Sequence, residues 1–436
     1  MGVVSRFGLV GFAAAVTCLA GCLVPTEITL NDCLVALENE DVDVQIGAME
    51  ALGTMGEHAA PAARRLSLFL GSQNPELAAG AARALGRIGP VCRQVSASGL
   101  LETLKDKRES YRFGPVWANA AQALGRFGPD ILPELIPLLE SPDTQLARAA
   151  AFAIHYVGPA AQPAVPHLIA LLRKNDPATR REAIFALQGI GPAAAEAVPA
   201  LIEALNCRED FHTQYWACRA LGSIGAGARP AVPVLIVLVH EGVTSVRRNA
   251  AATLGLIGPD IGAEGIAALI AAVSDPVEPV REQAVIALGR LGPAANTAVP
   301  TLRTALTARR LHCRPHAAYA FWQITGDSQL AVNVLCEELK VPEHQVVAIN
   351  HLGLMGPAAE PALDRLIASL DDEDPEVRIA AAEAIAQIGA RAVKAVPALK
   401  RLLFDREEDV RQAAESALRA MNIKLPEKAQ LPVGGL

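Results

Sequence analysis

Apolar residues recur along this chain at the three- and four-residue spacing of a helix that buries one face. In a well-formed stretch, Ala183, Leu187 and Ile190 lie at i, i+4 and i+7, on one side of a helix over 179–190. Another apolar segment over 165–172 precedes it, an Asp-Pro pair separates the two, and a Gly-Pro pair follows. Glycine tolerates the backbone of a helix end, and proline cannot continue a helix. The pattern predicts two helices joined by a turn.

A phrase similar to Ala-Leu-Gly-x-Ile-Gly closes this helix pair in copy after copy. The copies end at positions 56, 89, 128, 158, 191, 225, 258, 292, 325, 356, 389 and 422. The 422 − 56 = 366 residues between the first and last ends contain eleven intervals of about 33 residues, and a fixed period of that size indicates a solenoid. No strand-like alternation of useful length interrupts it. The sequence predicts an all-α fold, an α-solenoid of about twelve stacked two-helix repeats over 26–422, followed by a flexible tail over 423–436.

The repeat has the form V-R-x-x-A-A-x-A-L-G-x-I-G-P and follows a segment of the form A-V-P-x-L-x-x-L-L. It is clearest at Val280-Arg281 with Ala284, and at Val377-Arg378 with Ala381. In these residues the chain resembles the HEAT-repeat family, and in particular the short HEAT-like repeats also found in phycobilisome lyases. The resemblance implies that small residues let neighbouring helices approach, and that each helix pair buries its apolar face only when the next pair stacks on it.

The resemblance also implies a ladder in which an arginine of the second helix pairs with a turn aspartate. The arginines at this place are Arg180, Arg247, Arg281, Arg314, Arg378 and Arg411, and the turn aspartates are Asp176, Asp275 and Asp374. Trp117, Gln214 and Gln345 depart from this pattern, so we expect the ladder to be interrupted there. We expect a structural role for these pairs.

The N-terminus has the pattern of a secretion signal over 1–21, with one positive charge followed by a short apolar run. Leu19-Ala20-Gly21-Cys22 resembles the lipobox of bacterial lipoproteins, which implies cleavage before Cys22 and lipidation of its thiol. A plain transmembrane anchor is the alternative, although the apolar run is short for a span. Residues 22–25 would form a lipidated linker. Leu23 in place of aspartate implies, by the same resemblance, a cell-envelope location at the outer membrane, facing the periplasm.

Composition narrows the function classes. The chain is 51% hydrophobic and carries a net charge of −7, which argues against a disordered chain and against a nucleic-acid partner. The sequence contains no phosphate loop, nucleophile elbow or dinucleotide turn, so we expect no enzyme activity and no cofactor. There is no C-x-x-C motif, and His312 with His316 offers only two metal ligands, so we expect no metal site. Cys207 with Cys218 is the disulfide pair to test, against the alternative of small buried cysteines.

Two register positions in the second helices, six and two residues before each terminal position, vary in residue type instead of being apolar. We expect them to form an exposed stripe along one side of the superhelix, with the position nine residues upstream beside it. The arginines and aromatic residues of this stripe are our candidate partner-binding residues: Arg87, Arg126, Phe152, Tyr156, Phe185, Trp216, Arg219, Arg290, His316 and Tyr319. Such side chains dominate protein contact hot spots. The alternative is that the rings pack against adjacent helices.

Three inter-helix turns are irregular and lie three repeats apart. They are 105–114, which holds about six extra residues, 207–212, and 309–312. All three would emerge on one edge of the solenoid, either because a three-repeat unit was duplicated or because they form a shared binding rim.

These observations favour a membrane-tethered, extracytoplasmic scaffold that binds a protein or peptide partner along its central repeats. A lyase-like or other enzyme-associated HEAT-repeat protein is one alternative, implied only by the resemblance of the repeats. A self-assembling structural protein of the envelope, with homo-oligomeric contacts, is another.

Overall fold

The structure is a computed structural model, and it describes residues 28–174, 176–207, 210–307 and 313–423. The expected signal peptide over 1–21, Cys22 with its linker over 22–25, and nearly all of the expected tail over 423–436 lie outside the described residues. In the described part, twelve consecutive pairs of α-helices follow one another, as the sequence predicts.

The first helices of the pairs are α2 (Leu30–Ala36), α4 (Ala63–Phe69), α6 (Arg93–Thr103), α8 (Leu132–Leu139), α10 (Val165–Leu172), α12 (Val198–Leu205), α14 (Val232–Glu241), α16 (Gly262–Ala272), α18 (Val299–Thr307), α20 (Ser328–Glu338), α22 (Leu363–Ser369) and α24 (Val396–Leu402). The second helices are α3 (Val42–Met55), α5 (Pro75–Ile88), α7 (Val116–Arg126), α9 (Thr144–Val157), α11 (Pro177–Ile190), α13 (Phe211–Ile224), α15 (Thr244–Ile257), α17 (Glu278–Leu291), α19 (Arg314–Thr325), α21 (Pro342–Met355), α23 (Pro375–Ile388) and α25 (Glu408–Ala420).

Short 3-10 helices connect most pairs to the next. They are η1 (Gly56–Ala62), η2 (Pro90–Cys92), η3 (Pro129–Ile131), η4 (Gly158–Ala164), η5 (Gly191–Ala197), η6 (Gly225–Ala231), η7 (Pro259–Ile261), η8 (Gly292–Ala298), η9 (Gly356–Ala362) and η10 (Gly389–Ala395).

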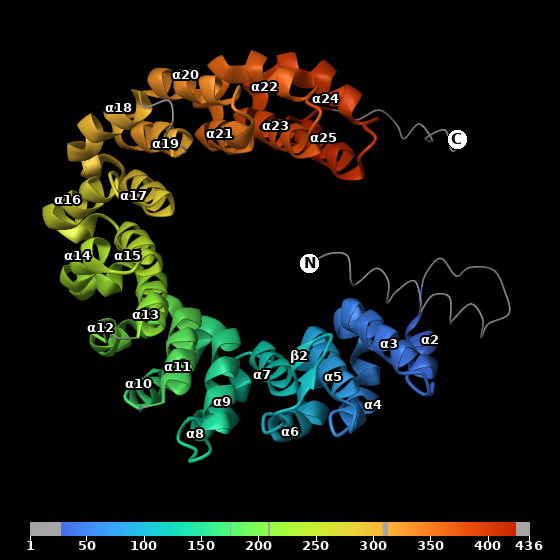
Figure 1. Ribbon diagram of the computed structural model, residues 1–436. Coiled ribbons are helices and arrows are strands. Elements are labelled where there is room, and N and C mark those ends of the chain that lie inside the picture. Colours follow the sequence, from blue (N-terminus) through green and yellow to red (C-terminus); the bar gives the residue numbers. More distant parts are fainter. Residues whose placement is uncertain (1–27, 175, 208–209, 308–312, 424–436) are drawn as a thin grey trace. The chain divides into compact units, whose positions relative to one another are not determined.

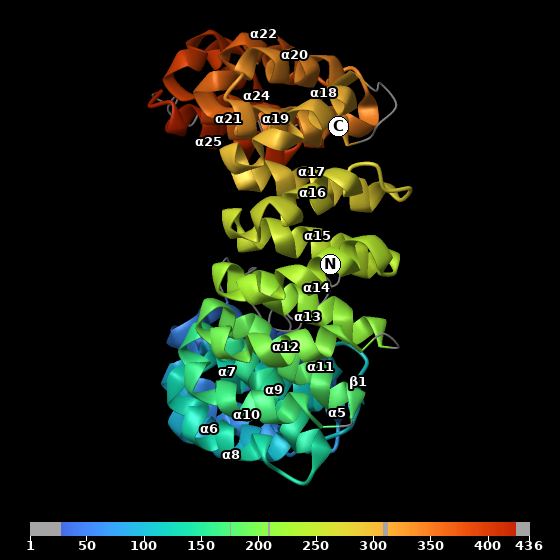
Figure 2. The same cartoon turned by 90° about the vertical axis from the view of Figure 1, so that its left-hand side faces the viewer.

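The chain divides into two compact units, one up to Val234 and one from Leu235, and the boundary lies within α14. In unit 1, the second helices α3, α5, α7, α9, α11 and α13 each pack on the next (Figure 1). In unit 2 the same holds for α15, α17, α19, α21, α23 and α25. The first helices cover one side of each row, so each unit has a first-helix layer and a second-helix layer (Figure 2).

Local sequence signals set the helix ends. Aspartate or asparagine caps several second helices, as where Asp176 accepts a hydrogen bond from the backbone N–H of Thr179 at 2.8 Å. At the other end, Gly89 has φ 90° and ψ −159°, and Gly191 has φ 66° and ψ −134°. An L-residue with a Cβ is strained in this backbone region, so glycine is required for the abrupt exit from the helix.

The second helices approach closely because small residues face one another across the seam. A Cβ atom added to Gly86 of α5 would lie 2.8 Å from the Cα atom of Ala123 in α7, and one added to Gly255 of α15 would lie 2.7 Å from the Cα atom of Ala287 in α17. The alanines are fully or almost fully buried, as are the leucines one position before these glycines. The core of each unit is therefore the seam between successive second helices, closed on its far side by the first helices.

The arginine ladder is present, and of the three aspartates expected in it Asp275 takes part. Arg247 pairs with Asp275 through two nitrogen–oxygen contacts of 2.9 and 3.0 Å, and both side chains are largely buried, at 16% and 9% exposure. Arg378 pairs in the same two-pronged way with Asp405, at 3.0 Å for both contacts. The arginine thus reaches forward to the turn of the next repeat, and bidentate geometry out of water makes these pairs structural.

Asp374 and Asp176 were expected in the ladder, but they cap their own helices. Asp374 accepts from the backbone N–H of Glu376 at 2.9 Å. The expected interruption at Gln345 is also incomplete, because its side-chain amide donates to Asp372 at 2.9 Å. Glutamine is long enough to keep one of the two hydrogen bonds that an arginine would make at this place.

The extra residues before α7 form a small hairpin, which the sequence does not predict. Strands β1 (Glu109–Ser110) and β2 (Gly114–Pro115) pair antiparallel beside α5 (Figure 2). The Glu76 carboxylate of α5 accepts hydrogen bonds from the backbone N–H groups of Tyr111 and Arg112 and from the Ser110 hydroxyl. The hairpin is therefore anchored to α5, and its Tyr111 side chain is 100% exposed at the tip.

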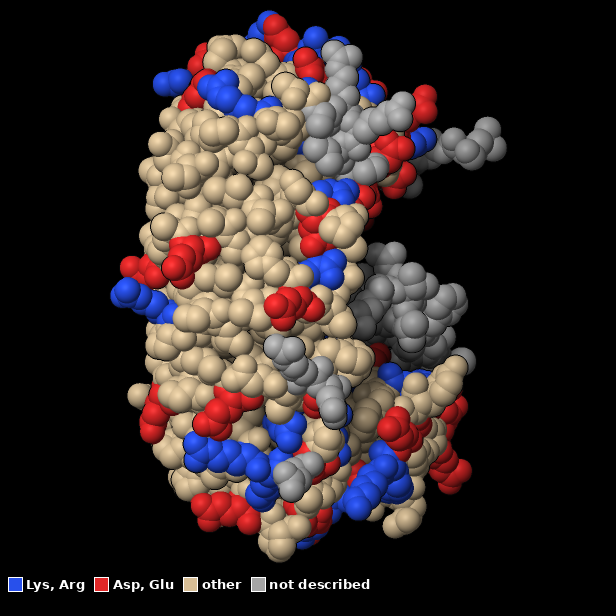
Figure 3. Space-filling model, turned by 60° about the vertical axis from the view of Figure 1, so that its left-hand side comes forward, with Lys and Arg blue, Asp and Glu red and all other residues tan. Residues whose placement is uncertain are grey.

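The central first helices carry few charges. α10 contains none, and α12, α14 and α16 contain one acidic residue each, at Glu203, Glu241 and Glu264. On the face drawn in Figure 3, charged side chains are correspondingly sparse over much of the surface. Charged groups that could meet a partner are concentrated instead in the second helices and in the turns.

By length and composition alone, two continuous helical stretches would pass as membrane spans, Pro177–Leu205 and Phe211–Glu241. The bent pair Thr244–Ile257 with Pro259–Ala272 would make a third. Each of the two continuous stretches combines two α-helices and the 3-10 helix between them, and about half of its apolar window is buried in the protein, at 56% and 44%. Their apolar character is explained by the repeat core.

Because the second helices are in such close contact, one methyl group added at the seam should lower the stability of the protein. Gly86→Ala should destabilise unit 1 by about 1–3 kcal/mol, because its Cβ would overlap the backbone of Ala123. Gly71→Ala is the matched control, since a Cβ atom there meets nothing within 4 Å. Urea denaturation followed by circular dichroism measures both. Equal stability of the two variants would show that the seam does not depend on this contact.

Candidate functional site

Four aromatic rings form an unbroken series across four consecutive second helices of unit 1. The ring centroids are 5.5 Å apart for Trp117 and Phe152, 5.7 Å for Phe152 and Phe185, and 5.8 Å for Phe185 and Trp216. The rings come from α7, α9, α11 and α13 in turn, and each is half-buried. We call these four residues the aromatic row. The rings pack across the helix seams and still keep an exposed edge.

Two further rings fix the middle of the row. The His155 ring stacks on Phe185 with centroids 3.7 Å apart, and its Nδ1 atom donates to the Phe185 carbonyl oxygen at 2.8 Å. Burial lowers the pKa of His155, against the smaller opposing effect of this hydrogen bond, so the neutral ring is favoured. Tyr156 contacts both His155 and Phe152, with centroids 5.0 and 5.3 Å apart. The Phe185 side chain is therefore held in one orientation.

An exposed arginine lies at the α13 end of the aromatic row. The Arg219 guanidinium carbon lies 5.1 Å from the Trp216 ring centroid and 5.8 Å from that of Tyr215. It also donates to the Tyr215 hydroxyl at 3.1 Å. Cation–π contacts of this kind hold a charged side chain over an aromatic surface without removing it from solvent.

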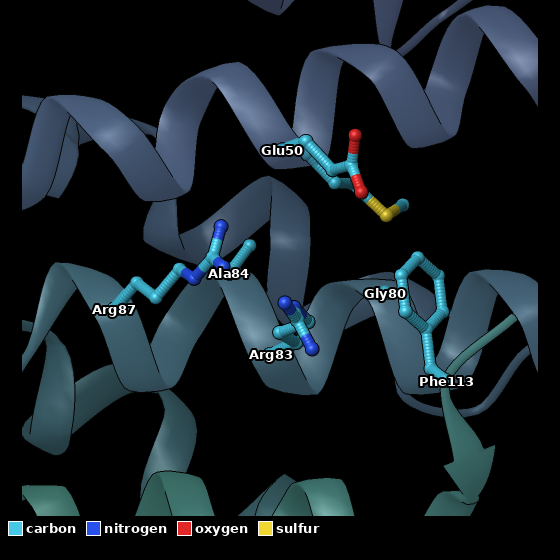
Figure 4. A pocket seen from close by; sticks show the side chains of 7 residues that line it. Glu50, Gly80, Arg83, Ala84, Arg87 and Phe113 are labelled. Atoms are coloured by element: carbon cyan, nitrogen blue, oxygen red, sulfur yellow. The ribbon is translucent and has the colours of Figure 1, made fainter. Parts of the chain in front are cut away.

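Arginines gather at the other end of unit 1. Figure 4 shows Arg83 and Arg87 of α5 beside Glu50 of α3, with the Phe113 ring of the hairpin to one side. The Arg83 guanidinium lies 5.6 Å from the Phe113 ring centroid. Burial, followed by the charge of Arg87 and with a smaller contribution from Arg126, lowers the pKa of Arg83. We call Arg83, Arg87 and Arg126 the arginine cluster; Arg87 and Arg126 are exposed, and Arg83 is half-buried.

Unit 2 contains a separate cluster around two histidines. His316 of α19 contacts Glu282 of α17 through Nε2 at 3.1 Å and His351 of α21 through Nδ1 at 2.9 Å. The Tyr319 ring stacks on His351 with centroids 4.6 Å apart. The hydrogen bond from His316 lowers the pKa of the Glu282 carboxyl, so His316 Nε2 donates to Glu282.

This arrangement leaves His351 neutral and buried. Its Nδ1 atom is buried without a hydrogen-bond partner, and burial together with the charge of His316 lowers the pKa of His351 to about 3. A proton on His351 would place a second cation beside His316 in a desolvated seam. The cluster is therefore stable only while His351, on α21, is uncharged.

The remaining sequence-based candidates are placed as follows. Arg290 is exposed on α17, and no contact joins it to the histidine cluster. Cys218 is buried, Cys207 is exposed and no disulfide joins them, and burial raises the pKa of the Cys218 thiol to about 12. Among the described residues no group of three or more His, Cys, Asp or Glu side chains could hold a metal ion, and His312 lies outside them. The irregular turns at 207–212 and 309–312 are likewise only partly described or not described at all.

The sequence analysis missed Trp117, His155, Glu282 and His351 as members of these clusters, whereas Arg83 stands on the predicted stripe, six residues before position 89. Trp117, His155 and His351 do not stand at either of the two register positions that define the stripe. They still reach the clusters because residues of different register can meet when neighbouring helices are offset. The sequence does contain one indication that Trp117 has a special role, because Trp117 occupies the position of the ladder arginine.

Comparison with known proteins agrees with the repeat architecture. The family profile described as HEAT repeats matches residues 165–255, 232–322 and 332–419, which together cover more than half of the chain. The chain therefore belongs to the HEAT-repeat family. A search of curated protein sequences finds no relative of this chain.

Solved structures share the fold at low sequence identity. In the Kap95:Nup1 complex, the match has a TM-score of 0.65 at 13% identity and covers 90% of this chain and 61% of that chain. Kap121p bound to Pho4p matches with a TM-score of 0.60 at 14% identity, over 90% and 53%. Importin beta matches with a TM-score of 0.59 at 15% identity, over 90% and 63%. The chain spans less than two thirds of each of these larger proteins, and the likeness shows a common α-solenoid fold.

The histidine cluster predicts that acid weakens unit 2. The unfolded chain takes up a proton at His351 near its ordinary pKa of 6.5, whereas the folded chain does so only near 3, so stability falls as the pH decreases from about 6.5 towards 3. His351→Gln should reduce this dependence by about 1 kcal/mol per pH unit. Hydrogen exchange in α19 and α21, corrected for intrinsic rates, measures it.

His240→Gln on α14 is the control, because that side chain is exposed. An unchanged pH dependence in His351→Gln would contradict the interpretation, as would an equal change in the control.

Proposed function

We propose that this protein is a lipid-anchored scaffold of the cell envelope, located at the outer membrane and facing the periplasm. It binds a protein or peptide partner through the second-helix layer of its central repeats and carries out no reaction of its own. The aromatic row in unit 1 is the main contact surface. Arg290, His316 and Tyr319 form a separate contact surface in unit 2.

The aromatic row is the observation that carries the binding proposal. Its four rings are aligned over four helices, are held in place by ring contacts and remain half-exposed. A ring fixed before binding loses little conformational entropy when a partner covers it, and large aromatic side chains supply most of the free energy at protein interfaces. The core of the repeat needs only small residues at this seam, so four large rings in succession are better explained by binding than by packing.

The structural neighbours support this class of function by analogy of fold. Kap95 with Nup1 and Kap121p with Pho4p are α-solenoids of similar architecture that were each solved with another protein bound. Fold alone does not fix function, so the argument rests on the site in this chain.

The envelope location rests on the N-terminal sequence. The apolar run followed by Leu19-Ala20-Gly21-Cys22 has the form that a lipoprotein signal requires, and a single acyl-modified N-terminus would tether the repeats to a membrane surface.

Binding through the aromatic row is tested by affinity capture from native envelope membranes, followed by a binding titration of the purified partner. Phe185→Ala with Trp216→Ala should weaken that binding at least tenfold, because two anchor rings are lost from one surface. Arg173→Ala is the matched control in unit 1, since Arg173 is exposed at the end of the first helix α10.

The circular dichroism spectrum of the double variant shows whether its repeats are intact. Equal affinity in the folded double variant and in the parent would remove the aromatic row from the binding surface.

The anchor is tested by metabolic labelling with an alkyne fatty acid. The parent should carry the label and sediment with membranes, whereas Cys22→Ser should carry none, because its hydroxyl does not replace the thiol in the lipidation. Cys18→Ser, four residues upstream, should behave as the parent. Label on Cys22→Ser, or none on the parent, would contradict a lipid anchor at this residue.

A further inference from the structure

The second-helix layer of unit 1 is basic, although the chain as a whole carries a net charge of −7. Helices α3, α5, α7, α9, α11 and α13 together contain seven arginines and four acidic residues, and 7 − 4 leaves a charge of +3. The second helices of unit 2, α15 to α25, contain eight arginines and eight acidic residues, which cancel. Positive charge is therefore a property of this one layer and not of the repeat.

The charge of this layer is only partly compensated inside the protein. Arg180 pairs with Asp210 at the turn edge, and Arg148 lies 3.7 Å from Glu182. Among the described residues, the carboxylate beside the arginine cluster is that of Glu50. Three guanidinium groups against one carboxylate leave an excess of positive charge at this end of the layer.

We propose that the second-helix layer of unit 1 binds an extended acidic peptide segment. Its carboxylates pair with Arg83, Arg87 and Arg126, and its proline or other apolar side chains lie on the aromatic row from Trp117 to Trp216. This inference rests on the proposed function, and it adds the chemistry of the partner. An extended segment fits because the arginine cluster and the aromatic row occupy successive helices of a single layer, which a linear chain can follow from end to end.

Planar guanidinium groups favour this ligand. Each can hold a carboxylate by two parallel hydrogen bonds, and arginine sheds its hydration more readily than lysine does. A short acidic peptide also meets only the basic layer, whereas a long polyanion would extend to the acidic remainder of the chain. A single-stranded nucleic acid offers phosphates and stacking bases as well, so the experiment includes one as a competing ligand.

The test is fluorescence anisotropy with the full chain. The probe is a fluorescein-labelled peptide in which a run of glutamates precedes prolines and a tyrosine, and a second peptide carries lysines in place of the glutamates. We expect the glutamate peptide to bind and the lysine peptide not to bind. Arg83→Gln, Arg87→Gln and Arg126→Gln together should weaken binding roughly tenfold or more and should flatten its dependence on salt.

Arg173→Gln is the matched control, because Arg173 is an exposed arginine at the end of the first helix α10, outside the second-helix layer. It should leave the affinity unchanged. A single Arg87→Gln variant, which alters only an exposed side chain, should give a smaller loss in the same direction if the triple variant does not fold.

Three results would overturn the inference: equal binding of both peptides, no effect of the arginine substitutions, or tighter binding of a single-stranded oligonucleotide than of the glutamate peptide. If the glutamate peptide does not bind but the native partner is still lost on Phe185→Ala with Trp216→Ala, the acidic partner is wrong and the scaffold function stands. If neither ligand depends on this layer, both proposals fall.

Discussion

The seam between successive second helices is the constraint on which the structure depends. Gly86 against Ala123 in unit 1 and Gly255 against Ala287 in unit 2 bring helix backbones together at distances that leave no room for another carbon atom. That spacing determines where every other register position falls. Residues on one flank of the seam are buried, the ladder arginines reach the next turn, and rings on the other flank come within 6 Å of one another.

The repeat architecture could be predicted because its determinants are local. Asp176 and Pro177 start α11 and Gly191 ends it, and each acts through its own backbone and nearest neighbours. The ladder acids were harder to predict. A turn aspartate can cap its own helix or receive the arginine of the preceding repeat, and one repeat cannot reveal which. In the structure Asp374 does the former, whereas Asp405 accepts from the Arg378 guanidinium as well as from the backbone N–H of Glu407.

The candidate site was predictable only in part, for a geometric reason. The stripe was defined by fixed register, and it includes Phe152, Phe185 and Trp216. Neighbouring helices are offset, however, so Trp117 and His351 reach the clusters from positions outside that register. The anchoring of the hairpin by Glu76 depends on a contact across more than thirty positions of the chain, which no local pattern contains.

The hairpin has a mechanical consequence. In a solenoid each repeat touches only its neighbours, so every joint between repeats is a place where the rod can bend. The hairpin precedes α7, donates hydrogen bonds to Glu76 of α5, and contacts α3 through the 2.6 Å ion pair of Arg112 with Asp43. One insertion thus braces two successive joints. We expect the repeats from α3 to α7, where the arginine cluster lies, to bend less than the repeats that follow. A bound chain would then contact a stiff surface at the arginine cluster and a more flexible surface beyond it.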